Sequence, residues 1–269
     1  MKNMIAFSDV DGTIYGKDYK YSKELQQSIL DFQKKGGYFV IATGNPPFSR
    51  IQKLATELNV RYLITSNGAT IFDNIEKKYI YKNLIDKSTQ QKVFEIAKKH
   101  KTQLNCWNEE NFYTYNRWKE HSKSYNYSLL DVSVIKEYNE NVNNLVKMEL
   151  FGDKESILNS YNELKKMNVT IAFMRDEHLE ITMPNTSKGI ALKWFVENHF
   201  NDSIENVMSI GDSPNDWSML EITGFSYAVE NASEKTKEKA KFYTSRYDQN
   251  GVSMALLDYM DRFNSKKLS

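Results

Sequence analysis

Met4-Ile5-Ala6-Phe7 followed by Asp9-Val10-Asp11-Gly12-Thr13 is the stretch that decides the fold. The apolar residues predict a short buried strand, and the polar residues after them predict where it ends. Side chains two positions apart point to the same side of an extended chain, so Asp9 and Asp11 can converge just beyond the strand. Gly12 permits a tight turn and a close approach of backbone N–H groups to an anion. The stretch therefore predicts either a site for a cation and a phosphate or an Asp-rich turn with local hydrogen bonds.

Strands and helices alternate through the first and last parts of the chain. Apolar residues recur at helical spacing after a Ser22 N-cap, and 38–42 is typical of a strand buried on both faces of a parallel sheet. This alternation predicts an α/β fold with a doubly wound parallel sheet and right-handed crossovers. The expected helices lie at 22–35, 46–58, 187–195, 216–222, 234–240 and 251–263, and the expected strands at 4–7, 38–42, 62–65, 207–210, 225–229 and 242–244.

The middle of the chain predicts a second domain, because 269 residues exceed the usual size of a single core. We expect a core of residues 1–83 and 184–269, and an inserted α+β domain of residues 84–183 with an antiparallel sheet. Loops at the carboxyl ends of core strands surround the site of such a fold and accept insertions. The insertion has expected helices at 89–100 and 154–167 and expected strands at 103–107, 112–115, 146–151, 170–174 and 179–182.

Composition describes an ordinary soluble globular protein, with 40% hydrophobic and 26% charged residues. Lysine and arginine number 36 against 35 acidic residues, so bulk charge predicts neither a nucleic-acid nor a membrane partner. The single cysteine, Cys106, excludes an intrachain disulfide and fits a reducing compartment. No stretch approaches the roughly 20 apolar residues of a membrane span, and Asp9 interrupts any signal-peptide core, so we expect a cytoplasmic protein.

Three further blocks of polar residues follow expected strands or open an expected helix. Thr43-Gly44 offers a hydroxyl and an accessible backbone, or is a simple turn. Lys188 opens a helix, where the helix dipole disfavours a cation that has no anionic partner. It is therefore either a site residue with such a partner or, like most lone lysines, a solvated side chain. Two carboxylates follow a strand in the stretch Gly211-Asp212-Ser213-Pro214-Asn215-Asp216. They either share a cation or serve as helix caps.

Taken in order, these blocks supply what phosphoryl transfer requires: a nucleophile, a proton donor, a metal and fixed donors around the phosphoryl oxygens. Hydrolysis of phosphate monoesters is among the slowest uncatalysed reactions, so one effect cannot suffice. A carboxylate nucleophile divides the task through an aspartyl phosphate, and a second carboxyl group protonates the leaving oxygen. A magnesium ion together with Lys188 would neutralise the phosphoryl charge.

The four blocks resemble those of the haloacid dehalogenase-like phosphohydrolases, in particular the Cof-type subgroup with a large cap domain. They occur in the family's order, and the sequences around Ser66-Asn67-Gly68-Ala69 and Glu230-Asn231-Ala232 also resemble that subgroup. The resemblance covers both halves of the core and, more loosely, the inserted domain, which would be the cap.

The resemblance implies a role for each block. Asp9 would be the nucleophile and Asp11 the general acid, later the base. The metal site would be formed by Asp9, the main-chain carbonyl of Asp11, Asp212 and Asp216. Asn67 and Gly68 would lie near the entrance, and the phosphate would be held by Gly12, Thr43, Gly44, Lys188 and Asn215.

One position departs from the family. Relatives commonly carry arginine after Thr-Gly, where this chain has Asn45 followed by Pro46-Pro47. An arginine there can pair with carboxylates or with the substrate, so the change concerns recognition of the leaving group more than the phosphoryl step.

Aromatic residues gather in one stretch of the cap. They form either the cap's own core or a wall over the leaving group. Beside them, Lys147 could present a cation toward the site, but strand alternation does not show which face Lys147, Met148 and Glu149 take. The four histidines are scattered, which does not favour a zinc site. The aromatic residues are Trp107, Tyr113, Tyr115, Trp118, Tyr125 and Tyr127, and the histidines His100, His121, His178 and His199.

We therefore expect a Mg²⁺-dependent phosphatase, a monomer or weak homodimer, that acts on small phosphorylated metabolites, with sugar phosphates first. Cap closure would exclude water and select the leaving group. Two alternatives remain: a phosphomutase of the same fold, and a phospho-accepting receiver-like module without turnover. A receiver needs only about half of this length and has no acidic block after its lysine.

Overall fold

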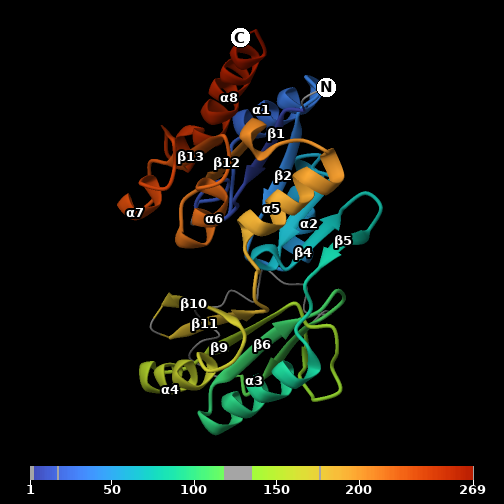
Figure 1. Cartoon of the computed structure of the whole chain (residues 1–269), viewed down its shortest axis with the longest axis vertical. Coiled ribbons are helices and arrows are strands. Elements are labelled where there is room, and N and C mark those ends of the chain that lie inside the picture. The colour runs from blue at the N-terminus through green and yellow to red at the C-terminus, as the bar shows by residue number, and fades with distance from the viewer. Residues whose placement is uncertain (1–2, 17, 118–134, 176, 269) are drawn as a thin grey trace. The chain divides into compact units, whose positions relative to one another are not determined.

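The computed structural model describes residues 3–16, 18–117, 135–175 and 177–268 (Figure 1). The chain divides into two compact units: a core unit of residues 1–45, 52–80 and 187–269, and an inserted unit of residues 46–51 and 81–186. Within the described ranges, no helix combines the length and the apolar character that crossing a membrane would require.

The sheet of the core unit has eight strands, in the order β14-β13-β12-β1-β2-β3-β4-β5. All pairs from β14 to β3 are parallel, and β3 pairs antiparallel with β4. β1 is central, since Ile5 lies opposite both Tyr38 and Val207. The predicted α/β fold with a parallel sheet is confirmed. Its strands are β1 Ile5–Ser8, β2 Tyr38–Ala42, β3 Tyr62–Thr65, β4 Thr70–Asp73, β5 Lys78–Lys82, β12 Val207–Gly211, β13 Phe225–Val229 and β14 Phe242–Thr244.

Helices of the core unit pack in pairs, α1 against α8 and α5 against α6 (Figure 1). Two predicted caps are present, because Ser22 Oγ accepts from Leu25 N at 3.0 Å and Ser187 Oγ accepts from Ile190 N at 3.2 Å. The apolar faces of these helices meet the sheet, as where the rings of Phe7 and Phe195 lie edge to face. The helices are α1 Lys23–Lys34, α2 Ser49–Glu57, α5 Lys188–Phe195, α6 Trp217–Leu220, α7 Glu234–Lys237 and α8 Gly251–Leu268.

Several helix boundaries differ from the sequence expectation, among them those of α7, which ends at Lys237 rather than at 240, and of α8, which continues to Leu268 rather than ending at 263. The helix expected from 46 begins at Ser49, because residues that precede proline favour an extended backbone and both Asn45 and Pro46 do so. The helix expected over 216–222 is a 3₁₀ turn, Pro214–Asp216, followed by the short α6.

The inserted unit has a six-stranded sheet in the order β10-β11-β9-β6-β7-β8. Neighbouring strands are antiparallel except β7 and β8, which are parallel. Two helices, α3 Lys87–Lys99 and α4 Lys154–Leu164, accompany this sheet. The strands are β6 Gln103–Trp107, β7 Phe112–Tyr115, β8 Ile135–Glu137, β9 Lys147–Phe151, β10 Thr170–Arg175 and β11 His178–Thr182.

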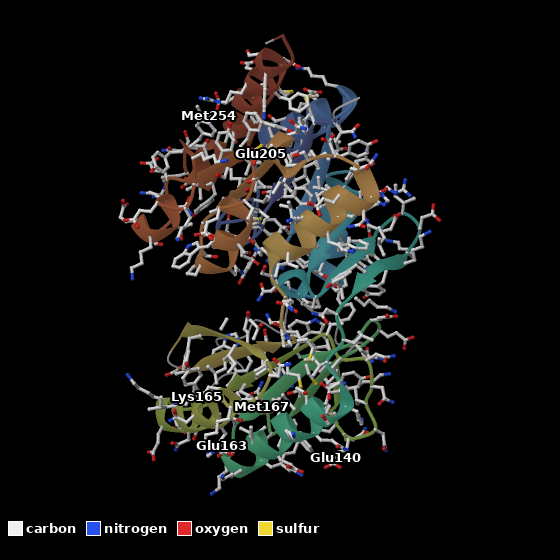
Figure 2. The ribbon with its side chains drawn as sticks, in the orientation of Figure 1. Glu140, Glu163, Lys165, Met167, Glu205 and Met254 are labelled. Carbon is white, nitrogen blue, oxygen red and sulfur yellow. The ribbon has the colours of Figure 1, made fainter. Side chains whose placement is uncertain are left out.

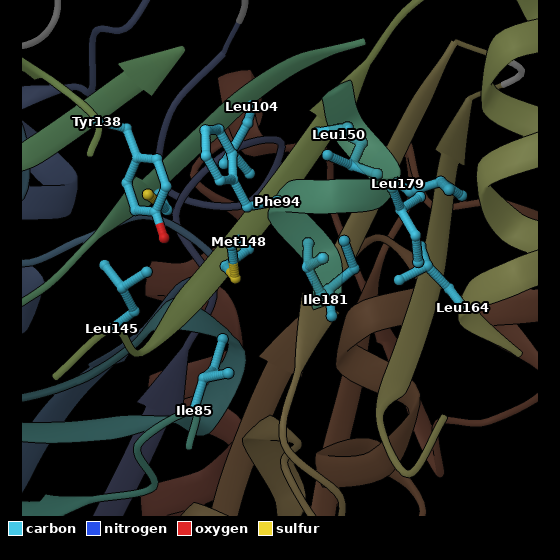
Figure 3. Close-up of a cluster of buried hydrophobic side chains, with 14 of the residues drawn as sticks. Ile85, Phe94, Leu104, Tyr138, Leu145, Met148, Leu150, Leu164, Leu179 and Ile181 are labelled. Carbon is cyan, nitrogen blue, oxygen red and sulfur yellow. The ribbon is translucent and has the colours of Figure 1, made fainter. Parts of the chain in front are cut away.

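The hydrophobic core of the inserted unit lies between α3, α4 and one face of its sheet (Figure 3). Alternate residues of β9 and β11 point into it, among them Met148, Leu150 and Leu179. The outer surface of the same unit is charged: Glu140 and Glu163 (Figure 2) pair with lysines of α3. Because side chains alternate along a strand, the residues between these core residues point to the opposite face of the sheet.

Candidate active site

Lys188 lies between two carboxylates brought from distant parts of the chain. Its Nζ donates to Asp9 Oδ1 at 2.6 Å and to Asp216 Oδ1 at 2.7 Å. Lys188 and Asp216 are fully buried, and Asp9 is 4% exposed. Burial alone would lower the pKa of Lys188, but Asp216 and Asp9 raise it above its usual value, so the ammonium keeps its charge.

Asp216 is held by the backbone of its own loop. Its Oδ2 accepts from Asp212 N and from Ser213 N, both at 3.0 Å. Gly211 makes room for this carboxylate, since a Cβ there would lie 2.4 Å from Asp216 Cγ. Both oxygens of Asp216 thus accept hydrogen bonds, and the residue fixes Lys188 and the loop.

Asp212 lies against the turn that follows β1. Gly12 has a φ of +90°, and a Cβ at this position would lie 2.3 Å from Asp212 Oδ2. Asp212 Oδ1 is buried and accepts no hydrogen bond from any residue that the structure describes. Burial first, and then the charge of Asp216, raises the pKa of Asp212 to about 7. An orphaned buried carboxylate oxygen is costly unless a ligand satisfies it.

Three of the carboxylates fit a divalent cation. Asp9, Asp212 and Asp216 each offer an oxygen, and these atoms lie within 4.8 Å of one another. Carboxylate oxygens are hard donors of the kind that Mg²⁺ prefers. The pKa of Asp9 is raised by burial and by the neighbouring carboxylates against the opposing effect of Lys188, so a further positive charge would relieve the repulsion. Together with the orphaned oxygen of Asp212, this donor set suits such an ion.

Asp11 and Thr43 are connected through Asn45. Asn45 Nδ2 donates to Asp11 Oδ2 at 2.7 Å and to Thr43 Oγ1 at 3.1 Å, and Asn45 N also donates to Thr43 Oγ1 at 3.1 Å. Thr43 is buried, whereas Asp11 is exposed. Sequence reasoning identified Asn45 only as a departure from the family, because no pattern shows that its amide reaches across 34 positions to Asp11.

Asn67, Gly68, Gly44 and Asn215 form the next part of the cluster. Asn215 Nδ2 lies 3.4 Å from Asn67 Oδ1, and a Cβ on Gly44 would lie 2.7 Å from the same oxygen. Gly68 has a φ of +95°, and a Cβ there would lie 2.2 Å from the carbonyl oxygen of Ser187. The turn after β3 therefore lies directly against the start of the helix that carries Lys188.

The loop after β1 is closed by hydrogen bonds of its own. Gly12 N donates to Tyr15 O at 2.8 Å, so this amide is already engaged. Asn231 Nδ2 donates to Gly12 O at 2.8 Å, and Asn231 Oδ1 accepts from Tyr247 N. Sequence reasoning quoted Asn231 only within the resemblance, and its part in holding the loop appears from the structure.

The inserted unit contains a second buried polar cluster. Lys147 Nζ lies 3.0 Å from Glu149 Oε1 and 2.6 Å from Glu180 Oε1, and its charge lies 5.2 Å from the centre of the Trp107 ring. Met148 faces the hydrophobic core, so Lys147 and Glu149 take the opposite face of β9. His178 also offers a ring nitrogen within 4.8 Å of oxygens of both glutamates.

The aromatic residues of the inserted unit lie on both faces of its sheet. Tyr113 belongs to the core of the inserted unit, and Tyr115 packs against it. Trp107 instead stacks on Phe112, with ring centres 5.6 Å apart. Trp118, Tyr125 and Tyr127 lie outside the described residues.

The core unit has a parallel sheet with an acidic cluster and a buried ammonium near the carboxyl ends of its central strands, which is where α/β enzymes bind their ligands. The chain belongs to the haloacid dehalogenase-like hydrolases, whose family model matches residues 6–256. The Bacillus subtilis 5-amino-6-(5-phospho-D-ribitylamino)uracil phosphatase YcsE is 27% identical over 260 residues, 92% of this chain and 92% of that protein. YwtE, a Bacillus subtilis phosphatase of the same description, is 26% identical over 273 residues, 91% of this chain and 94% of that protein.

Solved structures agree with this fold. A haloacid dehalogenase-like hydrolase from Bacteroides thetaiotaomicron matches with a TM-score of 0.85 at 23% identity, over 96% of this chain and 99% of that one. The sugar phosphatase BT4131, of haloacid dehalogenase subclass IIB, matches with a TM-score of 0.83 at 22% identity, over 96% of this chain and 99% of that one. The predictions of this family, of its Cof-type subgroup and of a phosphatase are confirmed.

Proposed function

We propose that this chain is a Mg²⁺-dependent phosphatase that hydrolyses small phosphorylated metabolites, sugar phosphates above all, through an aspartyl phosphate. The observation that carries the proposal is the buried ammonium of Lys188 between Asp9 and Asp216, beside the orphaned oxygen of Asp212. This arrangement places one positive charge beside the Asp9 carboxylate and leaves acceptor oxygens for a cation.

In the proposed reaction, Asp9 attacks the phosphorus atom, and the bond to the leaving oxygen breaks as Asp11 gives that oxygen a proton. Asp11 then takes a proton from the water that attacks the aspartyl phosphate, which frees Asp9 and releases inorganic phosphate. Lys188 and the Thr43 hydroxyl hold the phosphoryl oxygens while their charge changes.

The metal would be held by Asp9, the Asp11 carbonyl and Asp212, and Asp216 would orient this set through its loop. The ion supplies electrostatic stabilisation of the phosphoryl oxygens. The assignment of Asp216 to orientation follows from its hydrogen bonds, because both of its oxygens already accept from Lys188 or from backbone amides.

We further propose that the inserted unit is a cap that selects the leaving group, and that Lys147 and its glutamates take part in selection. The names of the relatives support phosphate esters of polyhydroxylated groups: two act on a phosphoribityl compound and another is a sugar phosphatase. Buried carboxylates and an ammonium are suitable partners for hydroxyl groups.

The test is turnover of para-nitrophenyl phosphate with Mg²⁺ by the wild type and by Asp9→Asn, which keeps the shape of the side chain. We expect repeated release of phosphate by the wild type and a loss of more than about 10³-fold in kcat for the variant. One equivalent of stable phosphoprotein would instead support the receiver-like alternative. With a sugar phosphate as substrate, retention of a bisphosphate intermediate would support a phosphomutase. A panel of sugar phosphates, nucleotides and pyridoxal phosphate would then rank the substrates.

A further inference from the structure

The side chain of Asn231 connects the loop that follows β1 with the turn that follows β14. Its Nδ2 donates to the carbonyl oxygen of Gly12 at 2.8 Å, and its Oδ1 accepts from Tyr247 N at 3.2 Å. Asn231 itself lies just after β13, and Gly12 precedes it by 219 positions in the sequence. Both ends of this half-buried amide are therefore engaged with the main chain of distant segments.

Gly12 is a position of the β1 loop that needs such support. Its φ is +90°, and glycine adopts positive and negative φ about equally readily, so its own preference does not maintain this conformation. Gly12 N donates to Tyr15 O at 2.8 Å, and Gly12 O accepts from Asn231. Because peptide units are planar, hydrogen bonds to the two units that flank Gly12 restrain both of its dihedral angles.

The same two peptide units lie beside proposed ligands of the metal. The carbonyl group of Asp11 shares one planar unit with Gly12 N, so the contact of this N–H with Tyr15 O sets the plane of that carbonyl. A Cβ at Gly12 would lie 2.3 Å from Asp212 Oδ2, so the loop and this carboxylate are in direct contact. A rotation about Gly12 would therefore change how two groups that are proposed to share one cation lie relative to each other.

Tyr247 supports the loop at a second point. A Cβ at Gly16 would lie 2.3 Å from Tyr247 Cε2, so the tyrosine ring lies directly against the end of the loop. The residue that donates its main-chain N–H to Asn231 thus also packs on the segment that Asn231 holds. The turn after β14 and Asn231 together form a fixed support for the β1 loop.

We propose that Asn231 is a positioning residue for the metal site: its hydrogen bond to Gly12 holds the Asp11 carbonyl where it can share one Mg²⁺ with Asp9 and Asp212. This inference rests on the proposed phosphatase function and on the metal ligands assigned there. Groups that orient metal ligands typically contribute 10-fold to 100-fold in metal affinity.

The test measures the Kd for Mg²⁺ of the whole protein by isothermal titration calorimetry. We expect Asn231→Ala to raise this Kd about 10-fold to 100-fold. Asn231→Leu, whose side chain has nearly the same shape but no polar atom, should raise it similarly while keeping the space filled. In turnover of para-nitrophenyl phosphate, excess Mg²⁺ should restore most of the activity that either variant loses at low Mg²⁺, which a general loss of folded protein would not allow.

Gln33→Ala is the matched control. Gln33 is also half-buried in the core unit and uses both ends of its amide, since Nε2 donates to Leu58 O at 3.1 Å and Oε1 accepts from Asn59 Nδ2 at 3.2 Å. These contacts precede β2 and β3 and so lie at the opposite edge of the sheet. Its Kd for Mg²⁺ should equal that of the wild type.

Two results would overturn the inference and leave the phosphatase function in place: a wild-type Kd for Mg²⁺ in the folded Asn231 variants, or an equal rise of Kd in Gln33→Ala. A wild type that neither binds Mg²⁺ nor releases phosphate would instead refute the proposed function itself.

Discussion

At the level of single residues, Lys188 determines how the site is held together. Its ammonium is fully buried and contacts carboxylates that come 179 positions before it and 28 positions after it. Removing one partner of a buried ion pair leaves an uncompensated charge, which typically costs 3–5 kcal/mol. The same contacts that position the proposed nucleophile therefore also stabilise the core unit.

Sequence reasoning could predict the convergence of Asp9 and Asp212, because the carboxyl ends of parallel strands meet at one edge of a sheet. For Lys188, which opens a helix, the family resemblance supplied the role. Sequence reasoning could not predict that Asp216 turns both oxygens toward Lys188 and its own loop, or that Asn45 reaches Asp11. Such details depend on rotamers and on loop backbone, which no periodic pattern encodes.

Two glycines of the core unit can test whether the contact between Gly68 and Ser187 positions Lys188. Gly68 and Gly36 both have positive φ, but only Gly68 would place a Cβ on backbone, 2.2 Å from Ser187 O. We expect Gly36→Ala to lower the free energy of unfolding by about 1–2 kcal/mol with kcat unchanged. Gly68→Ala should lower stability further and also reduce kcat, because Ser187 must move and Lys188 follows it.

Urea unfolding and para-nitrophenyl phosphate turnover would measure both effects in the two variants. A Gly68→Ala protein with the kcat of the wild type would show that the close approach to Ser187 has no part in placing Lys188.

At the level of elements, the alternation along β9 separates Met148 from Lys147 and Glu149. The sequence did not show which of these side chains face the core, since this depends on which face of the sheet the helices cover. The structure resolves it, because Met148 and Leu150 meet the hydrophobic core beside α3 and α4. Glu149 and Lys147 are consequently buried on the polar face, with 3% and 1% exposure.

The buried glutamate predicts a pH dependence for the inserted unit. Burial, opposed by Lys147 and aided by Glu180, raises the pKa of Glu149 from 4.5 to about 7. Between these pH values the unfolded chain releases a proton that the folded chain keeps, so stability falls as pH rises, by on the order of 3 kcal/mol. We expect Glu149→Gln to gain stability relative to the wild type between pH 5 and pH 7.5, as measured by hydrogen exchange of the β9 amides.

Asp86→Asn is the control for this experiment. Asp86 caps α3, and hydrogen bonds from Thr89 and Ser88 lower its pKa to about 2, so it is ionised in both states over that range. The difference in stability between Asp86→Asn and the wild type should stay constant with pH. A Glu149→Gln difference that is equally flat would contradict the assigned pKa.

Most helices and strands could be predicted, because apolar runs and helix caps are recognised from residues that are close together in the sequence. The structure gives β6, β7, β13 and β14 the expected bounds. β4 and β5 were missed: β4 pairs antiparallel with β3 near the edge of a sheet whose pairs from β14 to β3 are parallel, and β5 alternates lysine and tyrosine around a single isoleucine. Their pairing depends on β3, which a local pattern does not contain.

At the level of the whole molecule, the proposed metal ligands all belong to the core unit. Binding to the folded state alone stabilises it by about 2.7 kcal/mol at a ligand concentration 100 times Kd. Adding Mg²⁺ to the metal-free protein should therefore slow hydrogen exchange of amides in β1 and β12 by up to about 100-fold, with β9 unchanged. Asp212→Asn should abolish this protection. Equal protection of β9 and β12 would exclude a site built from the core unit alone.

The central position of β1 has a consequence for protein synthesis. Among the described strands, β1 is translated before the others, yet its partner β12 begins at Val207, opposite Ile5. At elongation rates of 5–20 residues per second, roughly 10–40 s pass on the ribosome before that neighbour emerges. Throughout this interval one edge of the nascent sheet has no native neighbour, and a chaperone would find its binding site there.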